Sequence, residues 1–259
     1  MRKKREPKIL FYDVETLPNI IYSWGIYDQT ALDIVEEWKL LCFAYKWFGE
    51  KKVTCVSRRH FKDNTEGAVV RELHRILEQA DIVVTHNGIS FDNKKANAKF
   101  AEWGLPPVKP AQQVDTKVLA SGHFAFTSNK LDNLGRTLKV GRKVKKMDFS
   151  VWLGCMNYLK NRRLPVSDFV QMEKYNKQDV LLLEKVYLKL RPWSVRHPNV
   201  AQISEKLASC PKCGGSKLKS KGFKYTTRCV YRQYQCSDCG GYCKGESLSV
   251  PKNKFSSLT

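Results

Sequence analysis

Short, mostly apolar runs of strand type early in the chain predict four strands, near residues 8–14, 20–27, 40–48 and 52–57. A helix is predicted near residues 65–80 and a further strand near 81–86, followed mostly by helices up to residue 190. Short connections favour antiparallel pairing of the early strands, whereas the strand that follows a helix is expected to join in parallel. The predicted fold class is therefore α/β, with a mixed five-stranded sheet flanked by helices.

The first predicted strand is an apolar run that ends in two carboxylates, Asp13 and Glu15. Side chains alternate across a strand, so these two face the same way. Two like charges this close in a buried strand are costly unless they are protonated or bound to cations, and a divalent metal is the usual way to keep both ionised. The alternative is a solvated strand end with two surface acids, which the apolar Val14 between them disfavours.

Two later helices carry polar residues that are ordinary when each is taken alone. Asp92 follows a predicted strand and a glycine turn, and it lies in the first turn of a helix predicted at 90–103. An acid there complements the helix macrodipole, which is sufficient to explain it. Tyr175 and Asp179 share one face of a helix predicted at 167–190, because they are four residues apart. A tyrosine on an apolar helix face is by itself best explained as a core residue.

Together these residues form three motifs, which are Asp-x-Glu at Asp13 and Glu15, Asn-Gly-x-x-Phe-Asp ending at Asp92, and Tyr-x-x-x-Asp at Tyr175 and Asp179. In this order and spacing the chain resembles the DEDD superfamily of exonucleases, in which the tyrosine marks the DEDDy branch. The second motif and the long gap before it are most similar to the proofreading domain of family B DNA polymerases and its stand-alone relatives, many of them encoded by bacteriophages. The resemblance covers roughly residues 8–190 and implies an RNase H-like fold with 3′–5′ exonuclease activity.

The resemblance also implies a two-metal phosphodiester hydrolysis, with two Mg²⁺ or Mn²⁺ ions as cofactors. Hard cations bind oxygen ligands, which the acids supply. By its place in the motifs, Asp13 would bridge both ions, and Asp92 would support one of them. Glu15 and Asp179 would hold the ion that carries the attacking water. Tyr175 would orient this water, since a tyrosine of ordinary pKa is a poor base at neutral pH.

Four residues beside the motifs are further candidates for substrate binding. Thr16 and Leu17 follow the first motif, where the family's backbone grips the terminal nucleotide. Asn87 and Phe91 belong to the second motif, and each either contacts substrate or shapes the turn.

Two more acids and two histidines lie near the motifs. Asp115 and Asp148 are interpreted as helix caps or turn formers rather than metal ligands. His86 and His123 receive no role, because the tyrosine motif makes a catalytic histidine unnecessary.

The far end of the chain carries two Cys-x-x-Cys-Gly-Gly knuckles, which contain Cys210, Cys213, Cys236 and Cys239. Each knuckle offers two thiolates from one tight turn, so the pair predicts a tetrahedral zinc ribbon with one structural Zn²⁺. The segment between them alternates well enough for a strand or hairpin. Cys229 and Cys243 fall outside this spacing and are interpreted as spare thiols, although Cys243 could replace a neighbouring ligand. A disulfide cluster is the competing explanation, and the sequence gives it no secretory context.

The formal net charge of +21 is opposite in sign to the acidic motifs and indicates a polyanionic partner. Residues 201–259 contain eleven lysines or arginines against three acids, interleaved with aromatic residues that suit base stacking. A solvated basic surface is the alternative. The expected partner is nucleic acid, with a single-stranded DNA 3′ end favoured, and a DNA polymerase or other replication protein is a further candidate.

The expected organisation is a basic tail (1–7), an exonuclease domain (8–191), a linker (192–207), the zinc ribbon (208–245) and a C-terminal tail (246–259). The sequence has no signal-peptide pattern and no long apolar span, so no membrane partner is expected. We expect an intracellular, cytoplasmic protein of a bacterial or phage-infected cell.

Two other functions compete with the exonuclease. An endonuclease of the RuvC or transposon type shares the RNase H-like fold, but it usually carries a lone Asp on its first strand. A non-catalytic nucleic-acid-binding scaffold is the second alternative, and the presence of all four acids argues against it.

Overall fold

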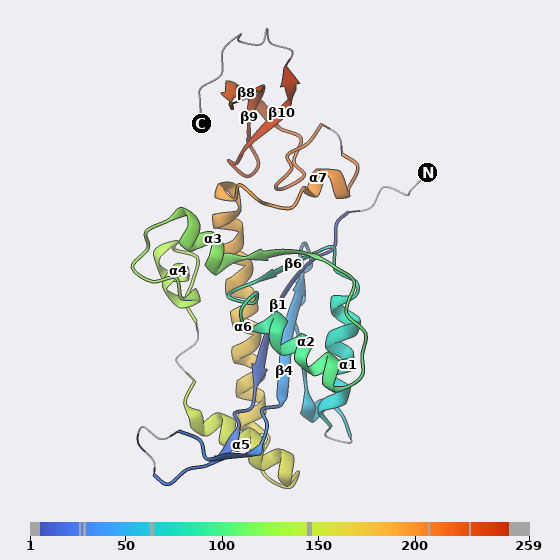
Figure 1. Cartoon of the computed structure of the whole chain (residues 1–259), viewed down its shortest axis with the longest axis vertical. Coiled ribbons are helices and arrows are strands. Elements are labelled where there is room, and N and C mark those ends of the chain that lie inside the picture. Colours follow the sequence, from blue (N-terminus) through green and yellow to red (C-terminus); the bar gives the residue numbers. More distant parts are fainter. Residues whose placement is uncertain are drawn as a thin grey trace. The chain divides into compact units, whose positions relative to one another are not determined.

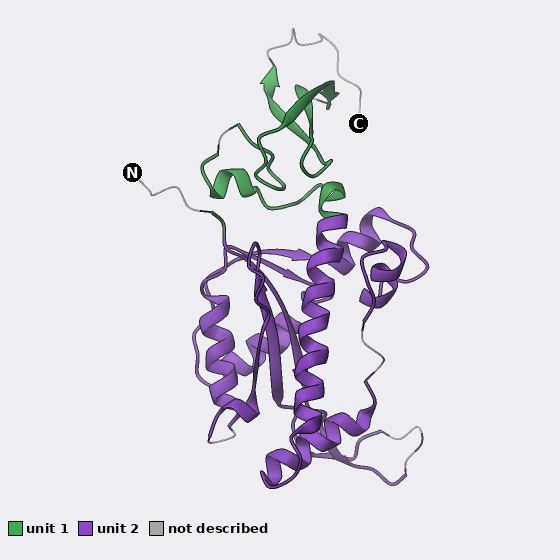
Figure 2. Ribbon diagram, turned by 180° about the vertical axis from the view of Figure 1, so that it is seen from behind, with its two compact units in different colours: residues 1–7, 190–259 green, residues 8–189 purple. Residues whose placement is uncertain are grey.

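The computed structural model describes residues 6–248 apart from 26, 28, 29, 63, 64, 144–146, 207 and 228. Within it the chain divides into two compact units, one of residues 8–189 and one of residues 1–7 with 190–259 (Figure 2). Most of the basic tail predicted at 1–7 and of the C-terminal tail predicted at 246–259 lies outside the described residues.

The larger unit is built on a five-stranded sheet in the order β5-β4-β1-β6-β7. Its strands are β1 (Ile9–Thr16), β4 (Leu40–Trp47), β5 (Thr54–Ser57), β6 (Ile82–Thr85) and β7 (Gln112–Asp115). β1 pairs antiparallel with β4 and parallel with β6, β4 pairs antiparallel with β5, and β6 pairs parallel with β7. The predicted α/β class with a mixed sheet is confirmed.

Helices cover both faces of this sheet, and alternation along β1 decides which residues meet which helix (Figure 1). Leu10 and Tyr12 join a buried cluster with α1 (Glu66–Leu77) and α2 (Asp92–Glu102). Phe11 points the opposite way and packs edge-on against Tyr187 of α6 (Ser167–Leu190), with ring centroids 5.4 Å apart. The face of β1 that carries Phe11 also carries Asp13, so the long helix α6 lies over the acidic end of the strand.

One predicted strand differs from the observed one, and one observed strand was not predicted. The strand predicted at 20–27 is only β2 (Ile20–Tyr22), which pairs with β3 (Asp33–Glu36) in a separate two-stranded sheet, where the side chains of β3 and most of β2 are exposed. The fifth strand of the main sheet is instead β7, which lies in a stretch that was predicted to be mostly helical. Its sequence, Gln-Gln-Val-Asp, buries only Val114 and Asp115 at the edge of the sheet, so it carries no strong strand pattern.

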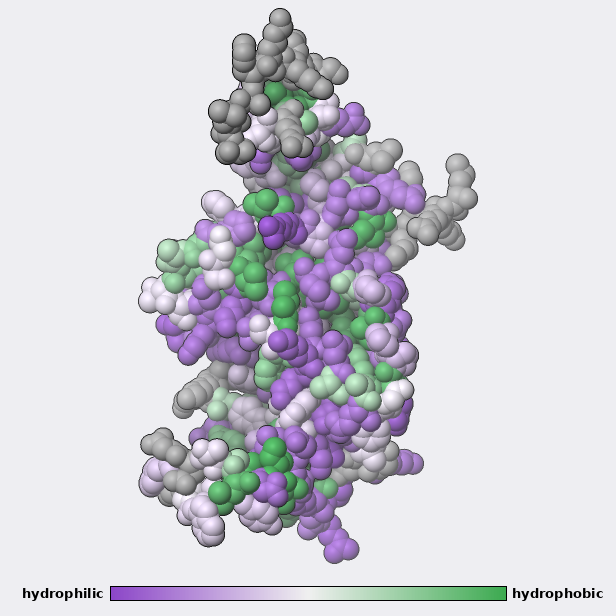
Figure 3. Space-filling view, viewed as in Figure 1, coloured by the Kyte–Doolittle hydropathy of each residue, from purple (hydrophilic) through white to green (hydrophobic). Residues whose placement is uncertain are grey.

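The remaining helices of this unit lie between β7 and α6, as the sequence predicts. They are α3 (Thr116–His123), α4 (Leu131–Thr137) and α5 (Phe149–Lys160). Hydrophilic residues dominate the face of the molecule in Figure 3, in keeping with the high charge of the chain. No helix within the described ranges is both long and apolar enough to cross a membrane.

The smaller unit holds a three-stranded antiparallel sheet in the order β10-β9-β8. Its strands are β8 (Leu218–Tyr225), β9 (Val230–Cys236) and β10 (Tyr242–Leu248). The predicted hairpin between the cysteine knuckles corresponds to β8 and β9. The segment predicted as a linker at 192–207 contains the end of a short 3₁₀ helix, η2 (Arg191–Trp193), and a short helix, α7 (Val200–Ile203).

Candidate active site and cysteine cluster

Three of the predicted acids come together where β1 meets α6. One carboxylate oxygen from each of Asp13, Glu15 and Asp179 lies within 4.8 Å of the other two. Asp13 and Glu15 share the face of β1 that α6 covers, and Asp179 projects from α6 onto that face. Oxygen ligands at this spacing could hold a divalent cation.

Asp92 contacts the same strand through the backbone of β1. It is the first residue of α2, it is only 3% exposed, and its Oδ1 accepts a hydrogen bond of 3.0 Å from the backbone N–H of Val14. One of its oxygens is thus committed to β1, and Asp92 is not part of the group of three. Its charge still acts on Asp13, whose pKa it helps to raise.

Burial and crowding make the ionised form of these acids unfavourable in the metal-free protein. Burial, and then the neighbouring carboxylates of Asp92 and Glu15, raise the pKa of Asp13 well above its usual range. Burial, and then Asp179, raise the pKa of Glu15 to about 8. Burial also raises the pKa of Asp92 to about 6, although its hydrogen bond from Val14 opposes the shift.

The two carboxylate oxygens of Asp179 have different surroundings, and only Oδ2 has a partner among the described residues. Asp179 is 2% exposed, and its Oδ1 is buried without a hydrogen-bond partner among the described residues. A buried, unpartnered carboxylate oxygen is costly unless a ligand satisfies it. Asp179 belongs to the cluster of three acids, so a cation bound there could satisfy this oxygen, and the donor set fits a bound cation.

Lys143 provides the positive charge at the site, and no motif of the sequence identified it. Its ammonium group forms an ion pair with Asp179 Oδ2 and donates to the Tyr175 hydroxyl at 3.2 Å. Burial opposes the charge of Lys143, but the Asp179 carboxylate outweighs it and raises the pKa of Lys143. The available signal was a basic run between residues 130 and 146, in which nothing distinguished Lys143 from its neighbours.

Asn176 is a second residue that the sequence did not reveal. It is fully buried, and its amide nitrogen donates to Asp13 Oδ2 at 2.7 Å. Its amide oxygen lies 3.8 Å from the sulfur atoms of both Cys42 and Cys55, whose thiols point weak hydrogen bonds at it. This arrangement fixes the amide so that its N–H₂ group faces Asp13. The one available signal was its position directly after Tyr175.

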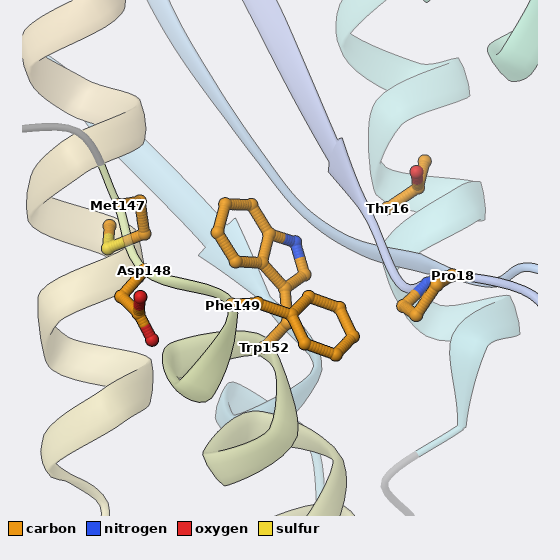
Figure 4. A pocket seen from close by; sticks show the side chains of 6 residues that line it. All are labelled: Thr16, Pro18, Met147, Asp148, Phe149 and Trp152. Atoms are coloured by element: carbon orange, nitrogen blue, oxygen red, sulfur yellow. The ribbon is translucent and has the colours of Figure 1, made fainter. Parts of the chain in front are cut away.

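The predicted substrate-binding residues differ in how accessible their side chains are. Thr16 lines a cavity of about 590 Å³ together with Asp148, Phe149 and Trp152. Figure 4 shows the two aromatic rings between Asp148 on one side and Thr16 on the other. Leu17 is buried, and its N–H donates to the carbonyl of Lys39, so its side chain belongs to the core.

Asn87 and Phe91 shape the connection between β6 and α2. Asn87 has a positive φ of 68°, and its side-chain oxygen accepts from Lys117 at 3.1 Å. Phe91 is partly exposed, and the Lys95 ammonium lies 5.7 Å from its ring centroid. Turn formation therefore accounts for Asn87, while Phe91 offers a ring face to the surroundings.

The two extra acids have the structural roles expected of them. Asp115 caps α3 by accepting from two backbone N–H groups of its first turn, and it also accepts from the N–H of Asn87 at 2.9 Å. Asp148 caps α5 through the N–H of Ser150. His86 contacts the Thr116 hydroxyl at 2.9 Å, and burial lowers its pKa to about 4, so it is neutral at pH 7.

A second cluster lies in the smaller unit, where the sulfur atoms of Cys210, Cys213, Cys236 and Cys239 are within 4.8 Å of one another. Two backbone amides point at this cluster, from Gly215 to Cys213 Sγ and from Gly241 to Cys239 Sγ, each at 3.4 Å. Gly214 and Gly240, which precede these two residues, have φ values of 74° and 77°, a conformation that residues with a side chain disfavour. The first glycine of each Gly-Gly pair therefore allows the turn in which the second glycine's N–H points at a sulfur atom. All four thiols are free, as are those of Cys229 and Cys243 outside the cluster.

A family model for the RNase H superfamily matches residues 10–191 of the chain. Among solved structures, the chain is similar to the family B DNA polymerase from the hyperthermophilic archaeon Pyrobaculum calidifontis, with a TM-score of 0.51, 12% sequence identity and coverage of 86% of this chain. The match covers 32% of the polymerase chain, so this protein spans about a third of that length, and at this identity the similarity concerns the fold. The search of curated proteins found no match. Because the family model extends over most of the sequence and includes every residue of the acidic cluster, the chain belongs to the RNase H superfamily.

Proposed function

We propose that this protein is a metal-dependent 3′–5′ exonuclease that hydrolyses phosphodiester bonds at the single-stranded 3′ end of DNA. The observation that carries the proposal is the convergence of Asp13, Glu15 and Asp179 in a nuclease superfamily fold, with one buried oxygen of Asp179 unpartnered. Tyr175 beside these acids favours the DEDDy type.

The acidic cluster would hold two Mg²⁺ or Mn²⁺ ions, with Asp13, Glu15 and Asp179 as direct ligands and Asp92 in support. When bound, these ions would supply the positive charge that activates water and stabilises the leaving 3′-oxygen. Cation binding also removes the cost of ionising crowded carboxylates, which the raised pKa values of Asp13 and Glu15 reflect.

The chain's own residues would position the reacting groups. Asn176 holds the Asp13 carboxylate in a fixed orientation through its 2.7 Å hydrogen bond. Burial raises the pKa of Tyr175, so its hydroxyl stays protonated at neutral pH and can orient water without acting as a base. Lys143 holds both Tyr175 and Asp179, and its charge would become available to a substrate phosphate once a cation neutralises Asp179.

The cavity beside Thr16 supports a strand end as substrate. Its lining residue Thr16 directly follows Glu15 in β1, and the rings of Phe149 and Trp152 form aromatic walls (Figure 4). An unstacked terminal base can pack against such rings, whereas a paired base inside a duplex cannot reach them. Thr16 and the exposed ring of Phe91 would contact the terminal nucleotides.

The four clustered cysteines would bind one Zn²⁺ and form a zinc ribbon. A sheet this small cannot build a sufficient hydrophobic core, so a metal is expected to stabilise it. The basic surface of this unit would bind nucleic acid or a partner such as a DNA polymerase or another replication protein.

Replacing Asp13 tests the activity directly. With Mg²⁺ and a 5′-labelled single strand, the protein should shorten the strand stepwise from its 3′ end, and Asp13→Ala should lower the rate by more than about 10³-fold. Asp33→Ala removes an exposed acid of β3 and serves as the matched control with full activity. Internal cuts would instead indicate an endonuclease of the RuvC or transposon type, and activity that survives Asp13→Ala would contradict the proposed site.

Tyr175→Phe removes only the hydroxyl that is proposed to orient water. We expect kcat to fall by about 10²-fold with little change in KM, because the loss affects the transition state rather than substrate binding. Tyr45→Phe, which removes a hydroxyl from β4 outside the site, should leave steady-state kinetics unchanged. Equal kinetics for both variants would show that Tyr175 is a packing residue.

The crowded acids should make metal-free stability fall as pH rises. Folding raises the pKa of Glu15 from 4.5 to about 8, so unfolded chains lose this proton first and stability decreases between these pH values. Glu15→Gln removes the effect and should raise the melting temperature by a few degrees at pH 8 but not at pH 4, as measured by thermal denaturation in chelator-treated buffer. Glu50→Gln, at an exposed turn, is the control, and an identical pH dependence for wild type and Glu15→Gln would refute the account.

Metal content tests the cysteine cluster. We expect one Zn²⁺ per chain by elemental analysis, lost in Cys236→Ser and retained in Cys229→Ser, which removes a thiol from the same unit but outside the cluster. Cys236→Ser should also unfold the smaller unit while the main sheet persists, because the two form separate compact units. Zinc bound equally by both variants would rule out the proposed ligands.

A further inference from the structure

A cavity of about 720 Å³ lies inside the smaller unit, between the segment 192–199 and the three-stranded sheet. Trp193 and Val195 line it from that segment, and Tyr242 lines it from β10. Its volume falls within the range of about 300–1,000 Å³ that is typical of ligand sites. It is separate from the acidic cluster, since all of its lining residues belong to this unit.

Large apolar side chains are exposed around this cavity. Trp193 is 59% exposed, Val195 is 80% exposed and Tyr242 is 48% exposed. Contiguous exposed apolar surface on a soluble protein usually marks a binding site. The flat rings of Trp193 and Tyr242 suit a flat partner group.

The charged side chains that line the cavity are all positive. Lys212, Lys224 and Lys244 line the cavity, and no acid does so among the described residues. The ammonium of Lys244 lies 4.0 Å from the ring centroid of Tyr231, which holds this side chain in place. Lys212 is held separately, because it donates a hydrogen bond to the carbonyl of Pro192. The site therefore combines aromatic faces with lysines, and its ligand must supply negative charge and flat apolar groups together.

We propose that this cavity binds single-stranded nucleic acid, with bases stacked on Trp193 and Tyr242 and phosphates paired with Lys224 and Lys244. A single strand offers both bases and phosphates, whereas an acidic peptide matches the lysines alone and an apolar peptide matches the rings alone. The choice of nucleic acid rests on the proposed nuclease function. Binding here does not depend on the acidic residues, so the strand is held at a second site.

Binding is measured on the full chain carrying Asp13→Ala, so that the strand is not degraded, by fluorescence anisotropy with a 5′-labelled oligothymidylate. Adding Trp193→Ala should weaken binding about tenfold, since a stacked base loses its platform. Trp193→Phe should restore most of the affinity because it keeps a ring. Trp24→Ala, which removes an exposed tryptophan from the larger unit, should have little effect.

The lysines are tested through the salt dependence of the same measurement. Lys244→Ala should lower the slope of log affinity against log salt concentration by about one, as expected for a lost phosphate contact. Lys219→Ala removes the same charge from β8 outside the cavity and should change affinity less. Zinc content and thermal denaturation of each variant establish that the unit is folded.

Equal binding by the Trp193→Ala and Trp24→Ala proteins would overturn the proposal, as would equal effects of Lys244→Ala and Lys219→Ala. Displacement of the oligonucleotide by polyglutamate at equal charge concentration would point to an acidic protein partner and would also overturn it. Failure of this proposal can be told apart from failure of the proposed nuclease function, because strand binding through Trp193 is measured without hydrolysis.

Discussion

Repulsion among carboxylates on one face of β1 is the constraint around which the larger unit is organised. Asp13 and Glu15 point the same way because side chains alternate along a strand, and α6 adds Asp179 to the same face. Three acids within 4.8 Å of one another oppose folding unless protons, cations or neighbouring dipoles compensate them. The protein keeps this unfavourable arrangement in the middle of its sheet, which is typical of a functional site rather than of a structural core.

Residues around the acids partly compensate the repulsion between their carboxylates. Lys143 pairs with Asp179 and Tyr175, Asn176 donates to Asp13, and the backbone of β1 donates to Asp92. These contacts hold the carboxylates in place without neutralising all of them. Under the proposed metal-dependent function, this arrangement would preorganise the site for cations. In the metal-free protein, the ion pair with Lys143 stabilises the ionised form of Asp179.

The smaller unit has too little buried surface to depend on a hydrophobic core. Its sheet exposes most of β8 and β10, so burial alone contributes little to its stability. The Zn²⁺ proposed for the four clustered thiols would crosslink this unit in place of a core. With such a metal crosslink, aromatic residues such as Trp193 and Tyr242 would not be needed in a core, and both are exposed.

The mixed sheet, the long helix α6 and the residues of both clusters were predictable from the sequence, because each depends on local periodicity or on fixed spacing between like residues. The fifth strand was not, since β7 takes its conformation from hydrogen bonds to β6 at the sheet edge rather than from its own Gln-Gln-Val-Asp pattern. Lys143 and Asn176 were also missed, because a lysine in a basic run and an asparagine on a helix acquire meaning only from the acids opposite them. By itself the sequence determined which acids and thiols could bind metal, whereas the tertiary structure decided which neighbours share their charge, because electrostatic energy depends on distances that only folding sets.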